Sequence, residues 1–138
     1  MTLPESPFQI DISASLSLTL HEAASRQVDA AIDALQAGDY DVALTLAGAA
    51  EGMIERTGHH MFGWPKQHPR ALERFDQKKW ISILNTERDW LKHGGQPAVQ
   101  ISCTDAAFMI ARAASKLEKW TPKMVAFKIW LLANLDNI

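Results

Sequence analysis

Before residue 20 apolar residues alternate with other residues along the chain, and from residue 20 on their spacing changes. Pro4 and Pro7 open this part, and beyond them every second position is apolar. These positions are Phe8, Ile10, Ile12, Ala14, Leu16, Leu18 and Leu20. Such alternation is typical of a half-buried β-strand, whereas the two prolines also suit irregular extended chain. Because one strand is not stable alone, we expect residues 1–19 to form an extended N-terminal arm, as a β-strand or as irregular chain, that packs on its own domain or on a symmetry mate.

From residue 20 the apolar spacing becomes helical. One helical face collects the apolar residues Leu20, Ala24, Val28, Ala31, Ile32 and Leu35. Gly38 is placed to end this helix, and Asp39 or Asp41 can cap a second one. The pattern therefore predicts a short antiparallel helix hairpin.

The second helix, from Val42 to about Arg56, carries small residues on its surface. A stripe of such positions consists of Ala43, Ala47, Ala50 and Ile54, and a second one of Gly48 and Gly52. A glycine inside a helix costs about 1 kcal/mol relative to alanine. Two of them in one helix predict that another helix approaches closely.

The middle of the chain combines a loop with a long helix. Residues 57–69 contain two glycines and two prolines and predict a loop. The amphipathic stretch that follows runs from Arg70 to His93, where Gly94-Gly95 stops it.

Two further helices follow a connector that contains Pro97. The first ends at Leu117 and is capped by Thr104 or Asp105. The second begins at Thr121-Pro122, with proline near the first helical position. Because its sequence is apolar nearly all round, we expect this last helix to lie centrally or in an oligomer contact.

Together these elements predict an all-α fold, with about five helices in an antiparallel up-and-down bundle over residues 20–138. The length of 138 residues and the 47% apolar content fit one globular domain. Cys103 is the only cysteine, which excludes an intrachain disulfide and a four-cysteine zinc site. His59, His60 and His68 have no cysteine or acidic ligand at metal-site spacing, so we predict a surface loop there, with no metal and no cofactor.

The sequence shows no sign of export or membrane insertion. Glu5 and Asp11 interrupt the N-terminal region, unlike a signal peptide. The most hydrophobic tract, Met124 to Leu135, contains Lys128 and is shorter than the roughly 20 residues that span a bilayer. We expect a cytoplasmic protein without a membrane partner.

The net charge of −2 conceals an uneven distribution. Residues 1–55 hold one basic and nine acidic side chains, whereas residues 56–138 hold thirteen basic and seven acidic ones. Two explanations remain open. The halves can neutralise each other across the fold, or the basic half can face a polyanion such as a nucleic acid.

Position 88 breaks an apolar seam. Ile81, Leu84, position 88 and Leu91 follow helical packing spacing, yet residue 88 is an arginine. A guanidinium does not lose its proton, so on an apolar stripe it needs an acidic partner or a functional role. Glu51, beside the small-residue stripe, is the candidate for a structural ion pair with Arg88.

The residues after Arg88 favour a functional role. His93 lies five positions later and can flank the same cleft where the helix ends. Asp89 precedes His93 by four positions, which is within side-chain reach on a helix. Histidine exchanges protons near neutral pH, although a histidine at this position can also simply cap the helix.

The string Arg88-Asp89-x-x-x-His93 resembles the R-x4-6-H motif of the HEPN superfamily, small all-α domains in which a polar residue often follows the arginine. The resemblance covers about residues 20–135, with support from the alanine-rich segments 46–51 and 105–113.

The resemblance implies a metal-independent endoribonuclease that acts as a homodimer. Arg88 would bind the scissile phosphate, His93 would act as general acid or base, and Asp89 would orient His93. The substrate-binding residues would be Lys92, Asn85, Lys78 and Lys79. The partners would be RNA or a nucleotide and, if the protein is a toxin, a cognate antitoxin.

The family also contains non-catalytic members. The alternative hypothesis is therefore a helical homodimer that binds a nucleotide, a nucleic acid or a protein, with Arg88 in a structural ion pair.

Overall fold

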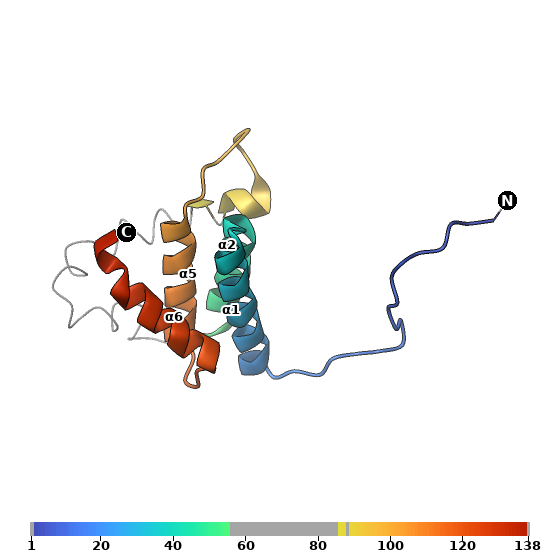
Figure 1. Cartoon of the computed structure of the whole chain (residues 1–138), viewed down its shortest axis with the longest axis horizontal. Helices are drawn as coiled ribbons and strands as arrows, with labels where there is room; N and C mark the ends of the chain where they lie inside the picture. Colours follow the sequence, from blue (N-terminus) through green and yellow to red (C-terminus); the bar gives the residue numbers. More distant parts are fainter. Residues whose placement is uncertain (1, 56–85, 88, 138) are drawn as a thin grey trace.

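The protein is helical, as the sequence predicts. The computed structural model describes residues 2–55, 86–87 and 89–137, and this part of the chain contains no β-strand. The helices are α1 (Leu20–Ala37), α2 (Tyr40–Met53), α5 (Cys103–Ser115), α6 (Pro122–Ala133) and the short 3-10 helix η3 (Leu135–Asn137) (Figure 1). Residues 86–87 and 89–93 are also helical.

The predicted hairpin is formed by α1 and α2. Thr19 caps α1 through a capping box, in which its hydroxyl accepts from the Glu22 backbone N–H and Glu22 accepts from the Thr19 backbone N–H. Gly38 ends α1 with a φ of 82°, which favours glycine. Asp39 then precedes α2, so α2 begins at Tyr40, two residues earlier than expected.

The start of α5 corrects one prediction. Ser102 is the N-cap, and its hydroxyl accepts from the Asp105 backbone N–H at 3.1 Å. The predicted caps, Thr104 and Asp105, lie inside the first turn. All three residue types are good caps, and Ser102 takes the position because its extended backbone aims the hydroxyl at the free N–H groups.

The start of α6 agrees with the prediction. Thr121 is the N-cap and Pro122 opens the helix. The Thr121 hydroxyl accepts from the Met124 backbone N–H at 3.2 Å and donates to Asp29 Oδ1 at 2.7 Å. One side chain therefore caps α6 and ties its first turn to α1.

The core lies where α1, α2 and α5 pack against one another. The small-residue face of α2 is buried: Ala43, Ala47, Gly48 and Ala50. Gly52, by contrast, is exposed, and a Cβ added to it would meet nothing within 4 Å. A close helix approach at Gly52 is therefore absent from the described part of the chain.

Helix α6 is more exposed than its sequence suggests. Only Met124, Phe127 and Leu131 are buried, whereas Ile129 is 65% and Trp130 39% exposed. Of the two expectations for this helix, a central position is not found among the described residues. The oligomer contact stays a prediction.

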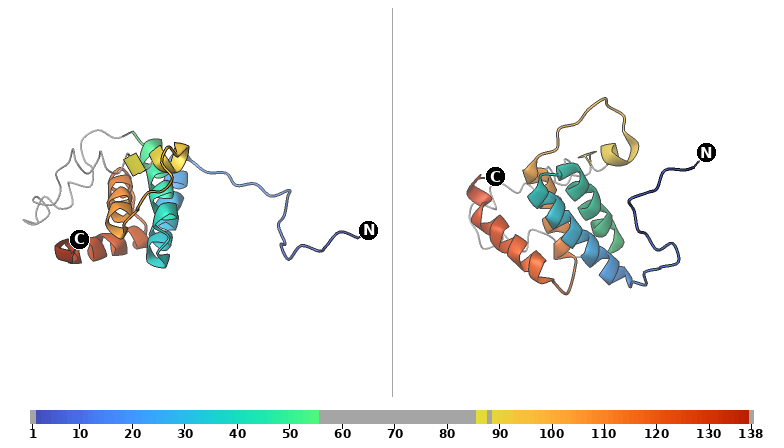
Figure 2. Two further views of the ribbon diagram at one scale, coloured as in Figure 1. Left: turned by 90° about the horizontal axis from the view of Figure 1, so that it is seen from above. Right: turned by 45° about the vertical axis from the view of Figure 1, so that its right-hand side comes forward.

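Residues 2–18, the N-terminal segment, contain neither helix nor strand and are exposed. Asp11 interrupts the alternating pattern with a turn, accepting from the backbone N–H and the hydroxyl of Ser13 at 2.9 and 2.6 Å. No other strand exists among the described residues to pair with this segment, so the strand that the alternation allows does not form in the single chain. Figures 1 and 2 show the segment leaving α1 on the side opposite to α6.

Candidate functional site

The described residues of the predicted motif lie at the end of the helical stretch 89–93. As predicted, glycine ends it: Gly94 and Gly95 have φ values of 71° and 111°, and the Gly94 N–H donates to the Trp90 carbonyl at 2.7 Å. The Trp90 indole donates to the Gln96 carbonyl at 2.9 Å, which holds the connector against the helix end. Leu91 packs against the core. The end of the helix is therefore fixed in position from two sides.

Three of the predicted site residues share the outer face of this helix. Asp89, Lys92 and His93 are all exposed. No hydrogen bond or ion pair joins these three side chains to one another, so the orienting contact from Asp89 to His93 stays a prediction. The other predicted residues lie outside the described residues: Arg88, Asn85, Lys78 and Lys79.

Glu87 is a site residue that the sequence analysis missed. Its side chain turns inward, four positions before Leu91, and only 6% of it is exposed. Burial, followed by a hydrogen bond with the Asp105 carboxyl, raises the pKa of Glu87 to about 8. At neutral pH the Glu87 carboxyl therefore keeps its proton and donates a hydrogen bond to the carboxyl group of Asp105, in the first turn of α5. The sequence feature that could have identified Glu87 is its spacing of four positions from Leu91, which places both residues on one helix face.

We expect Glu87 to make the protein less stable as pH rises. The folded state holds a proton between the ordinary pKa of 4.5 and about 8, while the unfolded chain releases it, so the free energy of unfolding falls through this window by about 1 kcal/mol per pH unit. Glu87→Gln removes this titrating group. The free energy of unfolding of the variant should therefore rise relative to that of the wild type between pH 5 and pH 8. Urea unfolding at several pH values measures this, with exposed Glu118→Gln as the control. Parallel pH curves for wild type and Glu87→Gln would contradict the assignment.

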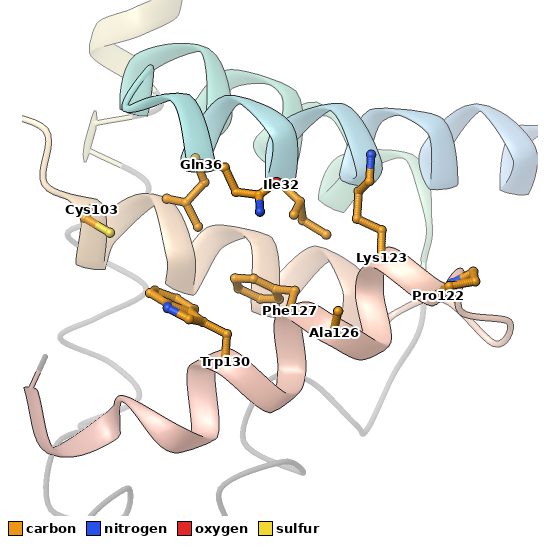
Figure 3. A pocket seen from close by; sticks show the side chains of 9 residues that line it. Ile32, Gln36, Cys103, Pro122, Lys123, Ala126, Phe127 and Trp130 are labelled. Atoms are coloured by element: carbon orange, nitrogen blue, oxygen red, sulfur yellow. The ribbon is translucent and has the colours of Figure 1, made fainter.

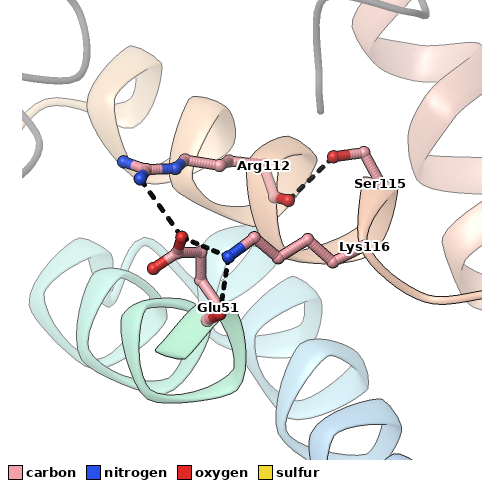
Figure 4. Close-up of polar contacts among 4 residues, drawn as sticks. All are labelled: Glu51, Arg112, Ser115 and Lys116. Carbon is pink, nitrogen blue, oxygen red and sulfur yellow. Dashed lines mark hydrogen bonds and ion pairs between the residues drawn. The ribbon is translucent and has the colours of Figure 1, made fainter. Parts of the chain in front are cut away.

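Glu51 is engaged by two cations, Arg112 of α5 and Lys116, the C-cap residue of that helix. Its Oε1 lies 2.7 Å from Lys116 Nζ and 3.1 Å from Arg112 Nη2, and Lys116 also donates to the Glu51 carbonyl at 3.0 Å (Figure 4). The sequence analysis placed Glu51 in an ion pair but considered only Arg88 as its partner. Arg112 and Lys116 are four residues apart on one helix, which was the available signal.

The ion pairs among the described residues connect the acidic and the basic half of the chain. Besides the two at Glu51, Lys123 Nζ lies 2.7 Å from Asp33 Oδ1. In each of these pairs, the acid belongs to residues 1–55 and the base to residues 56–138. At least part of the charge asymmetry is therefore neutralised inside the fold.

A separate apolar groove lies between α1 and α6 (Figure 3). Its volume is about 570 Å³. The walls include Ile32 and Leu35 from α1, Cys103 at the start of α5, and Phe127 and Trp130 from α6. Its described lining contains neither Asp89 nor Lys92 nor His93 of the predicted site.

Comparisons with known proteins add no family to this description. No family model, no curated protein and no solved structure matches the chain. Among the described residues, no helix has the length and apolar content to cross a membrane. The same residues hold no cluster of three histidine, cysteine or acidic side chains placed to bind a metal ion, and His59, His60 and His68 lie outside them.

Proposed function

We propose that the protein is a HEPN-like, metal-independent endoribonuclease that acts as a homodimer. The observation that carries the proposal is the string Arg88-Asp89-x-x-x-His93 in the sequence, of which residues 89–93 form the glycine-terminated end of a helix. The exposure of Asp89, Lys92 and His93 on one face supports it, because an RNA backbone can reach them. We extend the proposal to a cytoplasmic protein, built as an up-and-down five-helix bundle with an N-terminal arm.

In the proposed reaction, His93 carries out the proton transfers. His93 accepts the proton of a ribose 2′-hydroxyl, whose oxygen attacks the adjacent phosphorus. The bond to the 5′-oxygen of the next nucleotide breaks, and that oxygen takes a proton from the His93 of the second protomer. The products are a 2′,3′-cyclic phosphate and a free 5′-hydroxyl. The attacking hydroxyl thus belongs to the substrate itself.

The basic residues stabilise charge during this step. The Arg88 guanidinium binds the non-bridging oxygens of the phosphate, on which negative charge grows. Lys92 adds positive potential from the next turn of the helix. Asn85, Lys78 and Lys79 bind flanking phosphates, and a cognate antitoxin would restrain the activity by covering this face.

The wild-type protein should cleave single-stranded RNA in the presence of EDTA and leave 2′,3′-cyclic phosphate ends. The ends are identified by their resistance to phosphatase until acid opens the ring. An Arg88→Ala preparation, purified in parallel, separates the activity from a contaminating nuclease. Absence of cleavage, or equal cleavage by both preparations, would contradict the proposal.

The alternative is a non-catalytic homodimer that binds a nucleotide, a nucleic acid or a protein partner. The observation that favours it is the pairing of the acidic and basic halves of the chain, at buried Glu51 and at exposed Asp33. That pairing leaves fewer basic side chains to face a polyanion. In this case RNA stays intact, and binding of RNA or nucleotide is measured directly by fluorescence anisotropy.

A further inference from the structure

The helix end that carries the candidate site is joined to α5 by a connector that is mostly exposed. Asp89, Lys92 and His93 are exposed on residues 89–93, and residues 94–102, which contain no helix or strand, loop outwards before α5 begins (Figure 1). The hydrogen bond from the Trp90 indole to the Gln96 carbonyl joins the helix to this connector, not to α5. The inner side of the helix must therefore provide the contacts that hold it on the body of the fold.

Glu87 and Leu91 lie on this inner side. Leu91 packs against the core, and Glu87, two residues before Asp89, is 6% exposed. The Oε2 atom of Glu87 is buried and accepts no hydrogen bond from the described residues. A buried carboxylate without donors is costly, whereas a carboxylic acid is neutral and needs fewer partners. The surroundings of Glu87 thus favour its protonated form.

The described group that Glu87 contacts on α5 is the carboxyl of Asp105. Asp105 is half-buried in the first turn of α5, where its backbone N–H donates to the Ser102 hydroxyl at 3.1 Å. One proton between two carboxyl groups forms a hydrogen bond, whereas two ionised carboxylates repel each other. The one cation of α5, Arg112, lies about 10 Å further along the helix and pairs with Glu51, so it does not offset this repulsion.

We propose that the proton between Glu87 and Asp105 fastens the helix end that carries Asp89, Lys92 and His93 to α5. When Glu87 loses this proton, two negative charges meet at a buried interface and the helix end detaches, while α1, α2 and α5 stay packed. Lys92 and His93 are exposed and, among the described residues, form no ion pair with Glu87. The inference rests on the proposed function only for the role of the three exposed residues.

Alkaline pH is the condition that opens this contact. Burial raises the pKa of the Glu87 carboxyl from its ordinary value of 4.5 to about 8. The attached helix end holds a proton that the detached one releases, so rising pH favours detachment between these two values. The equilibrium constant for detachment should increase about tenfold per pH unit in this window and level off above pH 8.

Amide hydrogen exchange of the full chain from about pH 5.5 to about pH 9 tests the proposal. The protection factor, which removes the pH dependence of the chemical exchange step, is compared between residues 89–95 and α2. For residues 89–95 it should fall about tenfold per pH unit up to about pH 8. At every pH it should stay below that of α2, because the helix end detaches from a folded core. A protection factor of residues 89–95 that does not change with pH, or that equals that of α2 throughout, would overturn the inference.

Glu87→Gln is the main variant, because glutamine keeps the shape and a hydrogen-bond donor but has no proton to release. The protection factor of residues 89–95 should then be independent of pH. Glu118→Gln removes an exposed carboxyl between α5 and α6 and should keep the wild-type profile. Asp105→Asn, a second variant, should reduce the total fall with pH, since the neighbouring charge that raises the pKa of Glu87 is gone. The wild-type profile in Glu87→Gln or in Asp105→Asn would contradict the proposed contact.

Failure of this inference and failure of the proposed function are distinguishable, because hydrogen exchange is measured without RNA. A pH-dependent protection factor in a protein that leaves RNA intact rejects only the ribonuclease. RNA cleavage together with a protection factor that does not depend on pH rejects only the proton-dependent contact.

Discussion

Replacing His93 with alanine should lower the rate of RNA cleavage by at least about 100-fold, because a positioned general acid or base contributes roughly 10²–10⁴ to the rate. The substitution should leave folding intact. His93 is exposed at the last helical position, and the described part of the chain records no hydrogen bond to its side chain. Gly94, not His93, provides the helix end through its φ of 71°. The loss should therefore appear in the rate constant with an unchanged thermal midpoint.

A matched variant separates the role of His93 from a general loss of basic surface. Lys119 is also exposed and basic, and it lies in the connection between α5 and α6, outside the motif. Lys119→Ala should retain cleavage within about two-fold, the change expected of one distant surface charge. Rates are measured on a fluorescently labelled single-stranded RNA in EDTA. Equal rates for His93→Ala and wild type would remove His93 from the mechanism, and equal losses in both variants would point to electrostatic binding instead.

The helix ends of this fold were predictable because their causes are local. Gly38 and Gly94 adopt positive φ values that glycine tolerates, and Thr121-Pro122 combines a cap with a preformed first residue. The cap of α5 was the exception. Ser102, Thr104 and Asp105 all suit the position, and only the placement of the preceding connector selects among them.

The buried charges were less predictable because they depend on how helices pack. The sequence indicated that Arg88 needs an acidic partner and offered Glu51, but the contacts of Arg112 and Lys116 with Glu51 become visible only when α2 is placed against α5. Glu87 was harder still. It stands in a polar string that looks solvated, and its burial follows from the contact between its helix and the first turn of α5.

The ion cluster at Glu51 leads to the largest expected change in stability. Glu51→Gln should lower the free energy of unfolding by about 3–5 kcal/mol, because it leaves buried positive charge without compensation. The Glu51 side chain is 7% exposed, and those of Arg112 and Lys116 are 17% and 12% exposed. Both cations contact the same carboxylate oxygen, so removing its charge also leaves them to repel each other. Urea unfolding at neutral pH measures the loss.

The exposed pair of Asp33 and Lys123 is the matched control for this prediction. Its N–O distance of 2.7 Å equals that of Glu51 and Lys116, but its side chains are 58% and 40% exposed. Water screens such a pair, so Asp33→Asn should leave the free energy of unfolding close to that of the wild type. Adding Lys116→Met to Glu51→Gln should recover part of the lost stability, because it removes one of the two uncompensated cations. Similar losses for Glu51→Gln and Asp33→Asn would show that burial does not set the strength of this cluster.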